Sequence, residues 1–247
     1  MKKKGNTIFV GCSGYYYPDW KGRFYPEKLA SSKWLQYYSS IFNTVELNST
    51  FYHQPKLASL KTQYKNVPAD FKFSIKMNRY ITHIRRLKNT KSHIADFTGI
   101  VQDALQEKLD KFLFQLPPSF RYNEQNLQIL LENVPGSINN VIEFRHESWW
   151  NPNTARTLKK NSITFCNVDF PGLQNNFIST SKNFYLRLHG VPRLFYSSYS
   201  AARLKELSDQ LPKHETAYNI YFNNTAGIGF KNALTLRKIL AEQLQLH

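Results

Sequence analysis

Short apolar segments rich in β-branched and aromatic residues recur along the whole chain. Eight of them are predicted to be strands, at residues 8–12, 44–48, 72–76, 112–116, 140–144, 163–167, 184–188 and 218–222. The intervening segments repeat their apolar residues with helical period, which predicts helices at 33–42, 56–65, 92–108, 123–133, 153–160, 201–210 and 232–245. Strands that alternate with helices need crossover connections, so the pattern predicts a mainly parallel sheet.

The number of strand–helix units fits a closed barrel. Eight units in 247 residues match the size of a TIM-like (β/α)8 barrel. A doubly wound open sheet is the alternative, but it usually has a glycine-rich turn that leads directly into the first helix. Here residues 11–14 (GCSG) are followed by an aromatic loop instead. Since the sequence contains no linker or low-complexity segment, we predict a single α/β barrel domain over residues 1–247.

The composition is that of a folded, basic protein. Hydrophobic residues make up 41% and aromatic residues 15%, which excludes a disordered polycation although the net charge is +16. No apolar run could span a bilayer, and the apolar stretch after the basic residues 2–4, residues 8–10, is too short for a signal peptide. Cys12 and Cys166 form neither a disulfide framework nor a metal-binding spacing. We therefore expect a cytoplasmic protein without membrane contact; no pattern indicates its oligomeric state.

Positive charge is concentrated in one segment. Residues 56–91, named the basic segment below, contain ten Lys and Arg and one acid, Asp70. Such a segment is either a solvated helix face and loop or a surface that follows the phosphates of a nucleic acid. Composition alone does not separate the two.

Polar residues occur at the end of nearly every predicted strand, where a TIM barrel has its active site. Side chains alternate along a strand, so Glu46 shares a face with Asn48, and Glu143 shares one with Arg145. Ionisable side chains inside a barrel are costly unless paired, so the cluster is either a structural ion-pair network or a functional site. We predict a functional site with Glu46, Glu143 and His189 as catalytic residues and Asn48, Tyr52, Lys76, Gln115, Arg145, His146, Trp149, Asp169, Arg187 and Asn223 as ligand-binding residues.

Two kinds of site fit some of these residues but are not favoured. A divalent metal could use the carboxylates and imidazoles, namely Glu46, Glu143, His146, Asp169 and His189, but the sequence has no local metal-binding spacing. A glycosidase would use Glu46 and Glu143 as its carboxylate pair, but several cations lie among them. A metal requirement is therefore left open, and no nucleotide-cofactor motif is present.

The favoured site binds an anion. Lys76, Arg145 and Arg187, assisted by histidines, would hold a phosphate or carboxylate group while Glu46 or Glu143 acts as a base. The loops after the strands are also rich in aromatic residues, which would serve either as stacking surfaces for a base or sugar ring or as a hydrophobic lid.

A series of ordered motifs carries a resemblance. They are found at 11–15 (GCSGY), 45–52 (VELNSTFY), 73–76 (FSIK), 114–118 (FQLPP), 143–149 (EFRHESW), 187–190 (RLHG) and 221–224 (YFNN). Together they resemble the YecE-like family, the domain of unknown function 72, over nearly the whole chain. The resemblance implies a TIM-like barrel but no activity, because the family is uncharacterised. Its fold is similar to barrels of the endonuclease IV and xylose isomerase type, whose His, Glu and Asp metal ligands contrast with the Arg and Lys found here.

Two functions follow as hypotheses. The first is an enzyme, a hydrolase or lyase, that acts on a phosphate- or carboxylate-bearing small molecule or nucleotide at the barrel mouth. The second is a non-catalytic nucleic-acid-binding protein that uses the basic segment and the loop aromatics.

Overall fold

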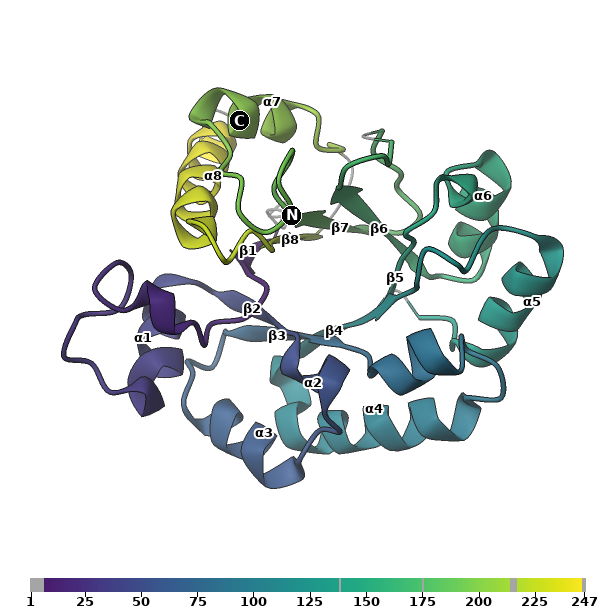
Figure 1. Cartoon of the computed structure of the whole chain (residues 1–247), viewed down its shortest axis with the longest axis horizontal. Coiled ribbons are helices and arrows are strands. Elements are labelled where there is room, and N and C mark those ends of the chain that lie inside the picture. Colours follow the sequence, from purple (N-terminus) through teal and green to yellow (C-terminus); the bar gives the residue numbers. More distant parts are fainter. Residues whose placement is uncertain (1–6, 138, 175, 214–216, 246–247) are drawn as a thin grey trace, which may run out of the picture.

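Eight parallel strands form a nearly closed barrel with the helices packed around its outside (Figure 1). The computed structural model describes residues 7–137, 139–174, 176–213 and 217–245; the basic start of the chain, residues 1–6, lies outside these ranges. The TIM-like barrel and all eight predicted strands are confirmed. The strands are β1 (Thr7–Cys12), β2 (Thr44–Leu47), β3 (Lys72–Lys76), β4 (Leu109–Gln115), β5 (Asn140–Glu143), β6 (Thr164–Asp169), β7 (Asn183–Leu188) and β8 (Ala217–Phe222).

Seven longer helices occupy the predicted helical segments. They are α1 (Trp34–Ile41), α3 (Leu57–Lys65), α4 (Lys91–Leu105), α5 (Glu124–Asn133), α6 (Pro152–Lys160), α7 (Ala201–Asp209) and α8 (Gly229–Gln245). The sequence did not predict the short helix α2 (Ser49–Tyr52) or the π-helical turn η3 (Tyr80–Ile84), which follow β2 and β3. Neither is long enough to show a hydrophobic period. Within the described part of the chain, no helix has both the length and the hydropathy needed to cross a bilayer.

Alternation along the strands separates the barrel interior from the outer core. On β7, Phe184, Leu186 and Leu188 belong to the large cluster of apolar residues that packs the strands against the helices. Tyr185, between them, belongs to a separate small cluster inside the barrel. The other members of that inner cluster are Leu113, Val141, Cys166, Val168 and Tyr221. Because Arg187 has the same parity as Tyr185, β7 directs this arginine into the barrel.

Strands β1 and β2 meet at a seam that a side chain completes. A single backbone bridge joins the two strands among the described residues. The hydroxyl of Tyr38, from α1, accepts a hydrogen bond from the Cys12 N–H at 2.7 Å and donates one to the Thr44 carbonyl at 3.1 Å. Gly11 is needed at this point, because a Cβ atom would collide with the Thr44 carbonyl oxygen. Tyr38 thus links two strands that lack a regular ladder.

We expect Tyr38→Phe to lower the free energy of unfolding by about 1–2 kcal/mol, because it leaves the buried Cys12 N–H without an acceptor. Urea unfolding measures this change. Tyr37→Phe is the matched control, since its hydroxyl bonds to none of the described residues. Equal stability of the two variants would show that the Tyr38 bridge is dispensable.

Three aromatic side chains of the loop after β1 belong to the core. Trp20, Phe24 and Tyr25 are 0%, 9% and 1% exposed, and Trp20 packs edge-on against Phe230 of α8 with 5.1 Å between ring centroids. The Trp20 indole N–H also donates to the Thr225 carbonyl at 3.0 Å. These side chains are therefore neither a stacking surface nor a lid, since they fasten the β1–α1 connection to the last helix.

Candidate functional site

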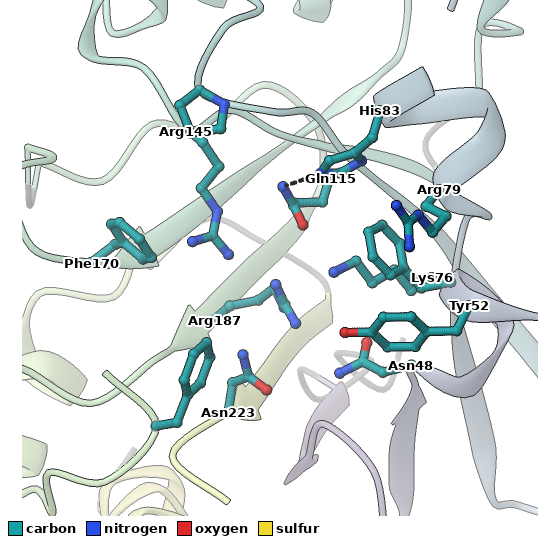
Figure 2. Close-up of a pocket in the computed structure, with 13 residues that line it drawn as sticks. Asn48, Tyr52, Lys76, Arg79, His83, Gln115, Arg145, Phe170, Arg187 and Asn223 are labelled. Carbon is teal, nitrogen blue, oxygen red and sulfur yellow. Dashed lines mark hydrogen bonds between the residues drawn. The ribbon is translucent and has the colours of Figure 1, made fainter. Parts of the chain in front are cut away.

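A pocket of about 450 Å³ opens at the carboxyl ends of the strands. Four cationic side chains line it, and no aspartate or glutamate is among its lining residues. Figure 2 shows three of the cations, Lys76, Arg145 and Arg187, pointing toward one another from β3, the segment after β5, and β7. The remaining lining residues are Asn48, Phe51, Tyr52, Arg79, His83, Gln115, Pro118, Phe170, Phe195 and Asn223.

Arg187 lies at the floor of this pocket between two buried carboxylates. Its Nε and Nη2 atoms donate to Glu46 Oε1 at 3.1 and 2.7 Å, and Nη1 donates to Glu143 Oε2 at 2.6 Å. All three side chains are 0% exposed. Three of the five guanidinium N–H groups are thereby used, which leaves two for a ligand.

Glu143, the second of these carboxylates, also holds Arg145 at the pocket wall. The Arg145 Nε donates to Glu143 Oε1, and its guanidinium carbon lies 4.2 Å from the centroid of the Phe170 ring. Its Nη2 is 3.3 Å from His189 Nε2, and His189 Nδ1 is 2.9 Å from the Asn223 side-chain nitrogen. The Glu143 carboxylate therefore orients both Arg187 and Arg145, and the Phe170 ring packs against Arg145.

Electrostatics fix the charge state of the floor. Burial alone would raise the pKa of Glu143, but Arg145 and Arg187 together hold it well below its usual range. Burial lowers the pKa of His189 well below its usual value, and Arg145 and Arg187 lower it further. At neutral pH Glu143 is thus a carboxylate and His189 a neutral imidazole.

The opposite wall carries two groups with perturbed pKa values. Burial, and then the charge of Arg187, lower the pKa of Lys76 to about 7. Burial and the charge of Lys76 lower the pKa of His83 to about 4. The Thr82 hydroxyl donates to the Asn78 carbonyl at 3.2 Å, so it accepts from His83 Nδ1–H at 2.9 Å. That tautomer leaves Nε2 to accept from the Gln115 amide at 3.3 Å.

A family model described as "Protein of unknown function DUF72" matches residues 9–247. The chain belongs to the DUF72 family. It is similar to the UPF0759 protein YunF of Bacillus subtilis (strain 168), with 32% identity over 152 residues, 59% of this chain and 53% of YunF. It is 26% identical to the UPF0759 protein YecE of Escherichia coli (strain K12) over 144 residues, 58% of this chain and 50% of YecE. The chain thus spans about half the length of the curated relatives it matches.

Solved DUF72 structures have the same fold. The DUF72 protein TM1631 of Thermotoga maritima superimposes with a TM-score of 0.85 at 33% identity, covering 95% of this chain and 99% of that one. The DUF72 protein EF0366 of Enterococcus faecalis gives a TM-score of 0.80 at 21% identity, covering 95% and 96% of the two chains. The sequence resemblance to the YecE-like family is therefore confirmed.

In this DUF72 barrel the predicted site residues fall into three places. The pocket is lined by Asn48, Tyr52, Lys76, Gln115, Arg145, Arg187 and Asn223. The three residues predicted to be catalytic, Glu46, Glu143 and His189, lie beneath it as partners of the arginines and are not among its lining residues. The remaining three, His146, Trp149 and Asp169, are also not among the lining residues.

Local structure explains why those three residues lie elsewhere. Trp149 is 0% exposed, stacks on Phe144 at 4.1 Å between centroids, and donates its indole N–H to the Phe120 carbonyl at 2.6 Å. His146 caps the turn after β5 by accepting from the Ser148 N–H at 3.2 Å. Asp169 has the opposite parity on β6 to Cys166 and Val168, which belong to the inner cluster, so its strand directs it away from the interior.

Sequence reasoning missed several lining residues of the DUF72 pocket. Arg79 is part of the basic segment, and His83 comes from the π-helical turn within that segment. Phe51 lies in α2 beside Tyr52, which was assigned to the site, and Phe195 lies in the aromatic segment after β7. Pro118 and Phe170 closely follow β4 and β6. A position just after a barrel strand is the sequence signal that could have identified them as lining residues.

The cationic residues of the basic segment do not all lie on one face of the barrel. Lys76 and Arg79 line the pocket. Lys61 pairs with Asp103 at 3.2 Å on the helical side. Across the described residues, no group of three or more His, Cys, Asp or Glu side chains is placed to hold a metal ion.

Proposed function

We propose that this DUF72 protein is an enzyme, a hydrolase or lyase, that binds the phosphate or carboxylate group of a small molecule in the pocket at the barrel mouth. The observation that carries the proposal is a pocket lined by four cations and by no carboxylate. Two buried carboxylates, Glu46 and Glu143, offset two of those charges, which leaves an excess of two positive charges when Lys76 is protonated. That excess suits a dianionic group such as phosphate.

An enzyme is favoured over a simple binding protein for two reasons. The pocket lies at the carboxyl ends of the strands, where barrel enzymes have their active sites. It also holds Lys76 and His83, whose pKa values are shifted to about 7 and about 4, and such shifts cluster at functional sites. Glu46 and Glu143 fit a positioning role, because each holds Arg187 and neither lines the pocket.

Arg79 offers the cleanest test of anion binding, because it is exposed at the pocket and bonds to none of the described residues. Calorimetric titration with inorganic phosphate should give saturable binding to the wild type. Arg79→Gln should weaken it about tenfold or more, since a charge-assisted hydrogen bond contributes roughly 1.5 kcal/mol or more. Arg86→Gln is the matched control, an exposed arginine of the same basic segment that does not line the pocket.

Three results decide between the hypotheses. Phosphate binding that Arg79→Gln weakens and Arg86→Gln does not supports an anion pocket. Equal weakening by both variants, or no saturable binding, contradicts it. Tight binding of a single-stranded oligonucleotide that falls steeply with salt, and that both variants weaken equally, would favour the nucleic-acid hypothesis instead.

A further inference from the structure

Lys76 is a lining cation whose ammonium group has no hydrogen-bond partner among the described residues. It is the last residue of β3, and its side chain points into the pocket (Figure 2). Its Nζ lies 4.0 Å from the centroid of the Phe51 ring, and among the described residues no atom accepts a hydrogen bond from it. Arg187, by contrast, is anchored by two carboxylates.

The buried lysines elsewhere in the barrel are held differently. Lys108 Nζ donates to the Tyr64 and Val67 carbonyls, each at 2.8 Å. Lys111 Nζ lies 2.5 Å from Asp110 Oδ1. These partners satisfy the two ammonium groups, as buried charges require. Lys76 has an aromatic face and two arginines nearby instead, which is an environment for a reactive amine and not for a structural one.

We propose that Lys76 Nζ is a nucleophile that forms an imine with the carbonyl carbon of a substrate whose carboxylate or phosphate group is held by the arginines of the same pocket. The anionic part of this assignment rests on the proposed function. The nucleophile itself rests on the position of Lys76 in the pocket, on its contact with Phe51, and on an Nζ atom that has no hydrogen-bond partner among the described residues. The substrate class is therefore an anionic aldehyde or ketone, such as an α-keto acid or a phosphorylated ketone, and the reaction class is a lyase.

The neutral amine is accessible at neutral pH. Burial and the neighbouring Arg187 lower the pKa of Lys76 to about 7, against 10.5 for an ordinary lysine. A bound anion would offset part of the effect of the arginines. Burial is the larger cause, and a ligand that displaces pocket water would strengthen it. Lys76 would therefore retain nucleophilic amine in the complex.

Formation of an imine on Lys76 needs no cofactor. The nitrogen lone pair adds to the carbonyl carbon, and a proton moves from nitrogen to the carbonyl oxygen to give a carbinolamine. The hydroxyl group then takes one further proton and leaves as water, so that a protonated imine remains on Nζ. Phe51 supplies an apolar face beside Nζ, and Phe170 and Phe195 line the same pocket. A bound substrate that excludes water from this pocket favours loss of the water molecule.

Borohydride trapping tests the proposal. The wild type is incubated at pH 7 with pyruvate and sodium borohydride, which delivers hydride to the imine carbon and fixes the adduct as a secondary amine. Intact-mass measurement should show one adduct, and peptide mapping should locate it on Lys76. Mapping on the wild type makes the result independent of any variant. Lys76→Arg should lose the adduct, and Lys72→Arg, a change on the same strand but outside the pocket, should retain it.

The arms of the experiment separate this inference from the proposed function. Hydroxyacetone serves as a carbonyl probe without an anionic group, and inorganic phosphate serves as a competitor. A Lys76 adduct that needs pyruvate and is suppressed by phosphate supports both proposals. An equal adduct with hydroxyacetone, unaffected by phosphate, supports the nucleophile and overturns anion binding. Phosphate binding without an adduct, or adducts spread over surface lysines, overturns the nucleophile.

Discussion

Glu46→Gln is expected to lower the free energy of unfolding by about 3–5 kcal/mol, because it removes one of the two carboxylates that compensate the buried charge of Arg187. Glu46 is 0% exposed and accepts hydrogen bonds from three side chains. It accepts from Ser13 Oγ at 2.6 Å, from the Tyr185 hydroxyl at 2.7 Å, and from Arg187. Ser13 follows β1, so Glu46 also ties the β1–β2 seam to β7. Urea unfolding followed by circular dichroism measures the change.

A surface glutamate provides the control for this result. Glu206 pairs with Arg203 at 2.8 Å on the exposed face of α7, and Glu206→Gln should change stability by less than about 1 kcal/mol. The double variant Glu46→Gln/Arg187→Met should be more stable than Glu46→Gln alone, because it removes the incompletely compensated charge of Arg187 while Glu143 keeps Arg145 as its partner. A Glu46→Gln protein as stable as Glu206→Gln would contradict a structural role for Glu46.

Lys76→Met is expected to act in the opposite direction and raise the free energy of unfolding by about 1–3 kcal/mol at pH 7. Burial first, and then Arg187, lower the pKa of Lys76 to about 7, and Arg145 lowers it further while Glu143 and Glu46 raise it. A lowered lysine pKa means that folding disfavours the ammonium form. Methionine removes that charge and keeps an apolar side chain of similar length in the pocket. The lost contact with an aromatic ring offsets only part of the gain.

The gain should depend on pH in a defined direction. Because the pKa of Lys76 is about 7 in the folded protein and 10.5 is its ordinary value, the unfolded chain binds more protons between these limits. Wild-type stability therefore rises with pH across that range, relative to the methionine variant. The advantage of Lys76→Met is full below pH 7 and shrinks toward pH 10.5. Unfolding curves measured at pH 6, 7 and 9 check this trend.

Lys72→Met is the control for Lys76→Met. Lys72 lies on the same strand, and its Nζ donates to the Glu107 carbonyl at 2.5 Å. Its replacement should bring no gain at any of these pH values. If Lys76→Met were no more stable than the wild type at pH 7, or kept its full advantage at pH 9, Lys76 would not be a strained cation. The pocket would then not disfavour the ammonium form of Lys76.

The alternation of side chains along a strand predicts which polar residues share the inner face of the barrel. Glu46, Glu143 and Arg187 each stand inside an apolar run, and alternation correctly puts them on the inner face with Tyr185. The same rule, applied to β6, would have separated Asp169 from the pocket, because Cys166 and Val168 are the inner residues there. The misplacement of Trp149 had a different cause. A large aromatic residue in a short turn can pack on the core as readily as at a mouth, and no local pattern distinguishes the two.

The sequence by itself determined the architecture of this protein. Hydrophobic period and segment order depend on local spacing, and eight strands alternating with seven longer helices allow few ways to bury their apolar faces. The tertiary structure decided which polar residues face a ligand and which support them. Arg187, Glu46 and Glu143 come from three strands, and only their register makes the carboxylates partners of the arginine below the pocket surface. Lys76 has no such partner among the described residues. The sequence could not show this difference, because charge pairing depends on distances between strands that spacing along one chain does not encode.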